Sequence, residues 1–178
     1  MEVTSAKFSA RQRLAETNDL VLEVKNAGDE TIPDLAITIY TGDEKADGPF
    51  NVRSDQEGLA DPNRPVWILE NQYPKILDET VDLAELDREP TAGAETAATD
   101  TYAFGALGPG ESITAVWRVT PVKGGTFTVH YEIAGGLDGQ AKAVTADGSP
   151  VEGEFVATIS TKPPNTRVTD SGEVEVVQ

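Results

Sequence analysis

Residues 107–133 read LGPGESITAVWRVTPVKGGTFTVHYEI, and this stretch decides the fold class. It opens on the turn Gly108-Pro109-Gly110, because glycine tolerates a positive φ and proline fixes its own φ. Two runs of alternating apolar residues follow, separated by a pair of glycines. The apolar positions are Ile113, Ala115, Trp117 and Val119 in the first run and Phe127, Val129, Tyr131 and Ile133 in the second. A period of two predicts β-strands with one face in the core.

The same alternation recurs along the rest of the chain. Further strands are predicted over residues 2–8, 20–26, 35–40, 155–159 and 168–177, with a short edge strand at 140–145. The turn sequence NAGD follows the strand at 20–26, so we expect this strand and the one at 35–40 to form an antiparallel pair. About eight strands with regular turns predict an all-β, immunoglobulin-like antiparallel β-sandwich.

Composition agrees with this fold class and excludes several functions. The chain has 16 glycines and 11 prolines among 178 residues, which favours many turns over long helices. Its 31 acidic and 14 basic residues give a formal charge of −17, so we expect neither a nucleic-acid partner nor binding to an anionic membrane surface. The absence of cysteine excludes disulfides and thiol chemistry. No apolar run is long enough to predict a membrane span.

Residues 42–100 interrupt the alternating pattern. Turn-forming sequences fill residues 42–65, and residues 91–100 are small and polar. Residues 77–86 have the pattern of one short helix, with Asp78 as its N-cap and Pro90 beyond its end. We therefore expect a single β-sandwich domain over residues 1–178, with a loop-rich insertion at about 42–100 that holds this short helix.

Several turn motifs resemble those of bacterial immunoglobulin-like surface domains. They are NAGD at 26–29 with IPDL at 32–35, LGPGES at 107–112, and GTFTV at 125–129. The family that they resemble is the CARDB type, the cell-adhesion-related domain in bacteria. The resemblance covers about residues 15–40 and 101–161. It implies an immunoglobulin-like fold and a bacterial adhesion protein that is extracytoplasmic, secreted or anchored at the cell surface, with its leader absent from this chain. The motifs mark turns and carry no chemistry.

The insertion contains the candidate ligand contacts. Trp67 stands in the apolar run at 65–68, and Arg53, Arg64 and Tyr73 lie near it in the sequence. Aromatic and arginine side chains together are typical of interaction hot spots and of surfaces on which sugars stack. A second interpretation stays open, in which Trp67 closes one end of the sandwich as a core residue. Trp117 follows the apolar period of its strand, and we expect it in the core.

Two acidic clusters are the candidate calcium sites, since Ca²⁺ prefers carboxylate and carbonyl oxygens grouped in loops. The first cluster is Asp43, Glu44 and Asp47, and the second is Asp147, Glu152 and Glu154. Neither has the spacing of a helix–loop–helix calcium site, so the alternative is a set of solvated acidic loops. We expect no other cofactor.

Catalysis by histidine is not expected. The single histidine, His130, lies on the opposite face of its strand from Val129 and Tyr131, which predicts an outward, partly exposed side chain. The sequence has no nucleophile elbow, phosphate-binding loop or dinucleotide fingerprint. A hydrolase that uses two carboxylates is the one catalytic alternative, because the chain is rich in acidic residues.

The sequence therefore predicts a non-catalytic, extracytoplasmic immunoglobulin-like module. Its expected role is protein–protein or cell-wall contact, or the spacing of other domains, with a protein or a cell-wall polysaccharide as partner. The alternative is a carbohydrate- or calcium-binding module that uses Trp67, Tyr73 and the acidic loops.

Overall fold

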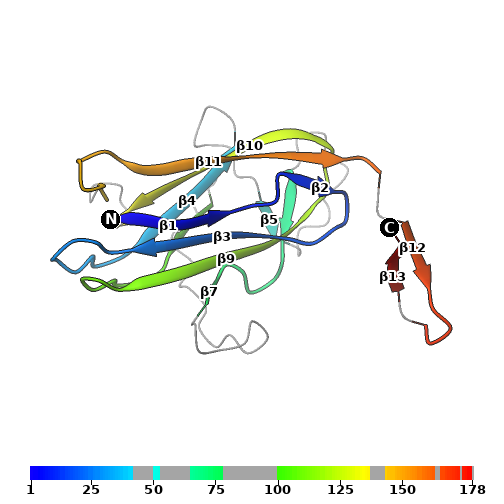
Figure 1. Ribbon diagram of the computed structural model, residues 1–178, viewed down its shortest axis with the longest axis horizontal. Helices are drawn as coiled ribbons and strands as arrows, with labels where there is room; N and C mark the ends of the chain where they lie inside the picture. The colour runs from blue at the N-terminus through cyan, green and yellow to red at the C-terminus, as the bar shows by residue number, and fades with distance from the viewer. Residues whose placement is uncertain are drawn as a thin grey trace.

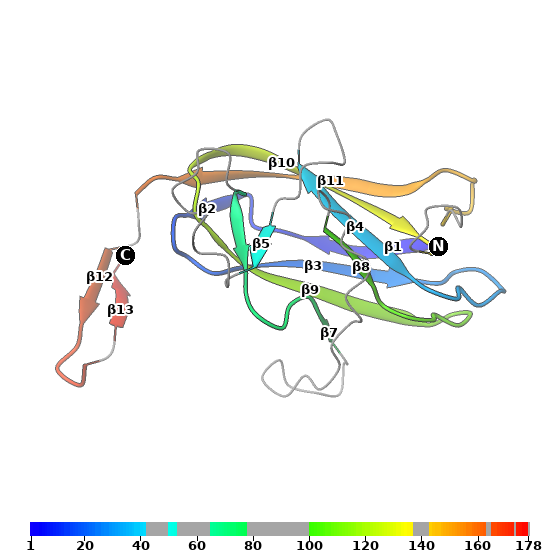
Figure 2. The ribbon, with the colours of Figure 1, turned by 180° about the vertical axis from the view of Figure 1, so that it is seen from behind.

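The computed structural model describes residues 1–41, 50–52, 65–77, 100–136, 143–162, 165–172 and 174–177. These residues form two β-sheets that face each other and one separate hairpin, and none of them is helical. Figure 1 shows the two layers edge-on, and Figure 2 shows them from behind. The predicted all-β, immunoglobulin-like sandwich is confirmed.

Sheet A contains six strands. In the order β1-β3-β9-β6-β5 they are β1 (Glu2–Lys7), β3 (Asn18–Lys25), β9 (Ser112–Pro121), β6 (Trp67–Leu69) and β5 (Phe50–Val52). The sixth strand, β7 (Lys75–Leu77), also pairs with β9. The described part of the region at 42–100 thus supplies three short strands that extend sheet A.

Sheet B contains five strands. In the order β2-β11-β10-β4-β8 they are β2 (Arg11–Arg13), β11 (Val151–Ser160), β10 (Gly125–Ala134), β4 (Ala36–Thr41) and β8 (Asp100–Ala103). Most neighbouring strands are antiparallel, as predicted. Two pairs are parallel, β5 with β6 and β2 with β11, and the sequence pattern did not indicate either of them.

The core lies between the sheets and contains most of the residues that the alternating pattern selected, together with Trp67. Val116 is buried too, but it lies outside this core cluster, on the face of β9 opposite Trp117. The largest fully buried side chains are Trp67, Trp117, Leu20, Leu22, Leu35, Ile37, Ile39, Val24, Val116, Val119 and Val129. They come from β3, β6 and β9 in sheet A and from β4 and β10, with the adjoining Leu35, in sheet B. The prediction that Trp117 is a core residue is confirmed.

The predicted pairing between residues 20–26 and 35–40 is wrong. β3 pairs with β1 and β9 in sheet A, whereas β4 pairs with β8 and β10 in sheet B. The connection between them crosses from one sheet to the other and is held by Asn26, which is buried. Its Nδ2 donates to the carbonyl oxygens of Glu30 at 2.8 Å and Leu107 at 3.0 Å. The turn motif therefore marks a crossing between sheets instead of a hairpin.

The predicted single strand at 168–177 is also wrong. The chain forms a hairpin of β12 (Asn165–Val168) and β13 (Val174–Val177), because it turns at Gly172, whose φ is +85°. This hairpin stands apart from the two sheets (Figure 1).

The remaining predictions for the insertion fall mostly on residues outside those described. Of the helix expected at 77–86, Leu77 is instead the last residue of β7, and the rest lies outside the described residues. The edge strand expected at 140–145 is described only from residue 143, where Val144 forms an isolated bridge with Pro150. That residues 1–178 form one domain stays a prediction.

Candidate functional site

Trp67, the first candidate ligand contact, lies in the core beneath one end of the sandwich. Its side chain has no exposed area, and the rings of Phe8, Phe50 and Phe127 surround it at centroid distances of 5.5, 6.4 and 5.9 Å. The indole N–H donates to Oε1 of Gln12 at 2.7 Å. A fully enclosed indole presents no face to a ligand, so its position fits the second interpretation of the sequence, in which Trp67 closes the sandwich.

Gln12 supplies the hydrogen-bond acceptor that offsets the free-energy cost of burying the indole N–H of Trp67. It is only 3% exposed, and its Nε2 donates to the carbonyl oxygen of Ser9 at 3.0 Å. Both ends of the amide and the indole nitrogen of Trp67 are thus satisfied inside the protein, as buried polar groups require. The residue ties β2 of sheet B to β6 of sheet A.

Tyr73, the second candidate, lies at the surface of sheet A in the turn between β6 and β7. Its backbone N–H donates to the carbonyl oxygen of Glu70 at 3.1 Å, and its side chain is half-buried. Lys75 Nζ lies 5.1 Å and Arg118 Cζ lies 5.3 Å from the centre of its ring. Both distances are within the range of a cation–π interaction.

A bidentate ion pair fixes the position of Arg118. Its Nε and Nη2 donate to the two carboxylate oxygens of Asp19 at 2.9 and 3.0 Å, and the two residues are direct partners in the β3–β9 register. About a third of each side chain is exposed. The hydrogen bond with Asp19 raises the pKa of the Arg118 guanidinium. We call Tyr73, Lys75, Arg118 and Asp19 the Tyr73 surface.

The electrostatics of the Tyr73 surface keep the phenol protonated. Burial raises the pKa of Tyr73, and the positive charge of Arg118 opposes this rise without reversing it. The phenolic O–H is therefore a donor and acceptor at neutral pH, next to two cations and one carboxylate. The surface offers an aromatic ring with fixed charges, which is the composition of protein–protein hot spots.

The other two candidates, Arg53 and Arg64, lie outside the described residues. The sequence did not select Asp19, Lys75 or Arg118 as site residues. Asp19 and Arg118 are 99 positions apart, and only the register of β3 against β9 brings them together. The polar face of the predicted strand that holds Arg118 was the one available signal, because Asp19 and Lys75 lie outside the predicted strands.

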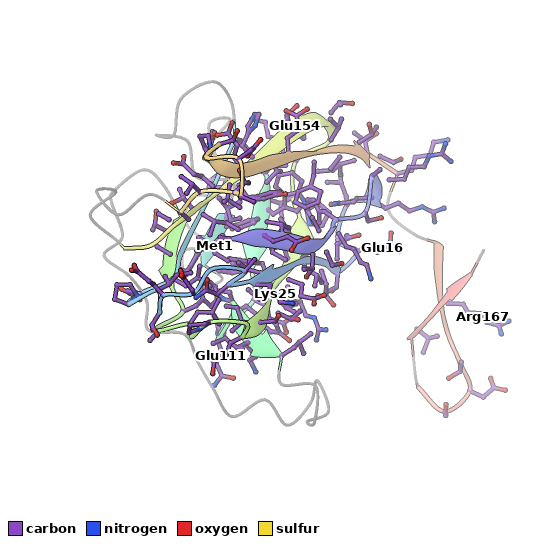
Figure 3. All side chains as sticks on the ribbon, turned by 60° about the vertical axis from the view of Figure 1, so that its left-hand side comes forward. Met1, Glu16, Lys25, Glu111, Glu154 and Arg167 are labelled. Atoms are coloured by element: carbon purple, nitrogen blue, oxygen red, sulfur yellow. The ribbon has the colours of Figure 1, made fainter. Side chains whose placement is uncertain are left out.

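The prediction of an outward, partly exposed His130 is confirmed. Its side chain is 27% exposed, and its ring stacks on Tyr40 with centroids 5.0 Å apart. Nδ1 lies 3.7 Å from Oε2 of Glu154, which Figure 3 labels on β11. The three residues come from adjacent strands of sheet B, on its outer face.

The candidate calcium ligands do not form a site in the part of the chain that the structure describes. There, no group of three or more histidine or acidic side chains could hold a metal ion. Asp147, Glu152 and Glu154 are all exposed, and Asp147 accepts hydrogen bonds from the Thr145 hydroxyl and the Ser149 N–H. These bonds lower the pKa of Asp147, so hydrogen bonds within the turn stabilise the negative charge of this carboxylate. Asp43, Glu44 and Asp47 lie outside the described residues.

Comparison with known proteins finds likeness in structure alone. No protein-family model matches the chain, and no curated protein matches its sequence. A CARDB domain of a Pyrococcus furiosus protein, solved with di-metal ions, is 10% identical with a TM-score of 0.46, over 87% of this chain and 84% of that one. The resemblance stated from the turn motifs is thus also found among solved structures.

Two further solved structures are similar. A cohesin module from a Clostridium perfringens family 33 glycoside hydrolase is 9% identical with a TM-score of 0.49, over 89% of this chain and 96% of that one. The collagen-binding domain of a Staphylococcus aureus adhesin is 9% identical with a TM-score of 0.42, over 89% and 99%. At these identities and scores, no ligand or residue role is carried over. Among the described residues, no helix is long and apolar enough to cross a membrane.

Proposed function

We propose that this chain is a non-catalytic binding module that works outside the cytoplasm and contacts another protein through the Tyr73 surface. The observation that carries the proposal is the geometry of Tyr73. The residue lies in the turn between β6 and β7, and its half-buried ring has Lys75 Nζ and Arg118 Cζ within 5.3 Å of its centre. The ion pair with Asp19 holds Arg118 in place before any partner arrives.

Preorganisation of this kind favours binding. A partner that covers the Tyr73 surface immobilises few additional side chains, so it loses little conformational entropy on association. Aromatic and arginine side chains are enriched among residues that dominate binding energies. A sugar stacked on Tyr73 would compete with the two cations for the ring, and this favours a protein over a polysaccharide as the partner.

Two further observations support the non-catalytic and extracytoplasmic parts of the proposal. The single histidine is engaged with Tyr40 and Glu154 on the outer face of sheet B. The turn motifs at residues 26–35 and 107–129 resemble those of bacterial surface domains. The open reading frame around this chain tests the location: an encoded leader or wall-sorting tail supports it, and an intact cytosolic frame contradicts it.

The binding test uses purified chain on two arrays, one of secreted and cell-surface proteins and one of soluble glycans. We expect a protein ligand whose affinity falls at least about tenfold in Tyr73→Ala, the loss typical of a hot-spot residue. The matched control is Tyr40→Ala, which removes another partly exposed tyrosine from the opposite sheet and should bind as the wild type does. Binding to glycans alone, equal losses in both variants, or turnover of a glycan would contradict the proposal.

A further inference from the structure

A groove lies on sheet B, on the outer side of β2 and β11 and away from the Tyr73 surface. It has a volume of about 1140 Å³, and its lining includes Arg11, Arg13, Glu16, Val156, Thr158 and Ser160. Because the β2–β11 pair is parallel, Arg11 lies beside Thr158 and Arg13 lies beside Ser160. We call this feature the β2–β11 groove.

The two arginines of the groove point away from the core. Gln12 between them is buried, so the alternation of a strand places Arg11 and Arg13 on the outer face, where both are exposed. Neither side chain makes an ion pair or hydrogen bond within the described part of the chain, which contrasts with the bidentate pair of Arg118. Glu16 is the single carboxylate among the lining residues, and Figure 3 labels it.

Charge makes this pair of arginines distinctive. The chain carries a formal charge of −17, so most of its surface repels an acidic partner. The residues that line the groove carry two guanidinium groups and one carboxylate, so their net charge is positive. The groove therefore attracts an anionic ligand, whereas most of the protein surface repels it.

The floor of the groove adds apolar and hydroxyl contacts. Val156 is 51% exposed, one of three large hydrophobic residues with high exposure in the described chain, and it lies next to Thr158 on the outer side of β11. The Oγ of Ser160 accepts the N–H of Lys162 at 3.2 Å, which leaves its own O–H available to donate. The groove thus combines two cations, a hydroxyl donor and an aliphatic surface.

We propose that the β2–β11 groove binds an extended acidic segment of a partner protein, with carboxylates at alternate positions. Arg11 and Arg13 are two residues apart on a strand, so their Cα atoms are separated by about 7 Å. An extended peptide repeats its side chains on one face at the same interval, so two carboxylates at i and i+2 match the two guanidinium groups. Each arginine can take a carboxylate in the bidentate geometry that Arg118 already shows with Asp19.

The same geometry argues against other anions. A nucleic acid would have to approach a chain of charge −17 over a long stretch of backbone, which the rest of the surface opposes. Val156 suits the methylene groups of a glutamate side chain, which can lie along it while the carboxylate reaches an arginine. The inference goes beyond the Tyr73 surface, because the groove belongs to the other sheet and shares no residue with it.

Fluorescence anisotropy of the whole chain with a labelled peptide tests the proposal. The probe is a short peptide of alternating glutamate and valine, and a second peptide has glutamine at every glutamate position. We expect the first peptide to bind at low salt, to weaken as salt is added, and to bind at least about tenfold better than the second, since charge-assisted hydrogen bonds are the stronger ones.

Matched double variants distinguish binding at the groove from an effect of the overall charge of the chain. Arg11→Gln with Arg13→Gln should weaken the acidic peptide about tenfold or more, corresponding to about 1.4 kcal/mol. Lys7→Gln with Lys25→Gln removes the same charge from β1 and β3 of sheet A and should leave binding within about twofold, since the lost charges do not touch the peptide. Melting curves show whether each variant is folded, which we expect because Arg11 and Arg13 are exposed.

Three results would overturn the proposal. They are no binding of the acidic peptide at low salt, equal weakening by the two double variants, and binding of a uronate polysaccharide that needs Arg11 and Arg13 while the peptide does not bind. None of them bears on the Tyr73 surface, because Tyr73→Ala should leave binding of the acidic peptide unchanged. If Tyr73→Ala instead lost peptide binding, the groove and the Tyr73 surface would not act as separate sites, and the proposal of a separate groove would be contradicted.

Discussion

Trp67 and Tyr73 are six residues apart in the sequence and were selected together as ligand contacts, yet they lie in opposite environments. Trp67 is fully buried among three phenylalanine rings, whereas Tyr73 is half-exposed with two cations near its ring. Both are placed by the same strand, because β6 and β7 pair in turn with β9. The comparison shows that two aromatic residues close in sequence differ in burial because the sheet places one inside the core and the other at the surface.

The two regions also differ in how their polar groups are satisfied. Around Trp67 the single polar contact is internal, from the indole to Gln12. Around Tyr73 the charges are paired but remain partly exposed, as in Arg118 with Asp19. The first arrangement stabilises the fold, and the second leaves groups with which a partner can interact.

The largest expected effect is that of Trp67→Ala. Removing an enclosed indole should lower the free energy of unfolding by about 3–5 kcal/mol, the usual cost of deleting a large aromatic side chain from a core. Urea denaturation followed by circular dichroism measures the loss. A loss below about 1 kcal/mol would place Trp67 at the surface and remove the contrast with Tyr73.

Gln12→Ala should lower the free energy of unfolding by about 1–3 kcal/mol, because it leaves the buried indole N–H of Trp67 without an acceptor. The control is the same change made together with Trp67→Phe, in which no indole remains. In that background Gln12→Ala should cost less, and the difference measures the coupling between the two residues. Equal costs in both backgrounds would show that the hydrogen bond contributes nothing to stability.

Alkaline pH should destabilise the protein through its buried phenols. Burial raises the pKa of Tyr131 from its ordinary value of 10.0, so the folded state keeps this proton while the unfolded chain releases it. As pH rises through about 10, the unfolded chain is favoured and the free energy of unfolding falls. Urea midpoints between pH 8 and 11 should show this fall, and Tyr131→Phe should reduce it. An identical fall in Tyr131→Phe would contradict the assignment.

The smallest expected effect on stability is that of Tyr73→Ala. Losing two partly exposed cation–π contacts and the partial packing of the ring against the core should cost about 1–2 kcal/mol, less than the loss of a fully enclosed indole. The same urea measurement that shows a large loss for Trp67→Ala should therefore show a small one here. A loss equal to that of Trp67→Ala would make Tyr73 a core residue and would weaken the proposed binding role.

Strands that cover the core over a long run were predictable from the sequence. β3 and β10 each bury every second residue, as Leu20, Leu22 and Val24 do, and this leaves a period of two. β9 follows the same period with Ala115, Trp117 and Val119 and additionally buries Val116. β2 was not predictable, because it has three residues and its one buried side chain is a glutamine. That burial depends on the indole of Trp67, 55 positions away.

Alternation identifies the residues that face the core but not the sheet to which a strand belongs. β3 and β4 both bury one face, so a hairpin and a crossing between sheets produce the same pattern. The candidate site could be predicted only in part for the same reason. Tyr73 could be selected by its residue type, but its neighbours Asp19 and Arg118 are brought together by the β3–β9 register, which the sequence pattern does not reveal. The groove at Arg11 and Arg13 likewise depends on the parallel pairing of β2 with β11.

The measurement that tests the central contrast most directly is acrylamide quenching of tryptophan fluorescence in the wild-type chain. The protein has two tryptophans, and both Trp67 and Trp117 are fully buried. We predict blue-shifted emission that acrylamide quenches weakly in the folded protein and strongly after unfolding in urea. A folded protein in which one tryptophan is quenched as readily as in urea, and in which Trp67→Phe removes that component, would show that Trp67 lies at the surface and would contradict the account.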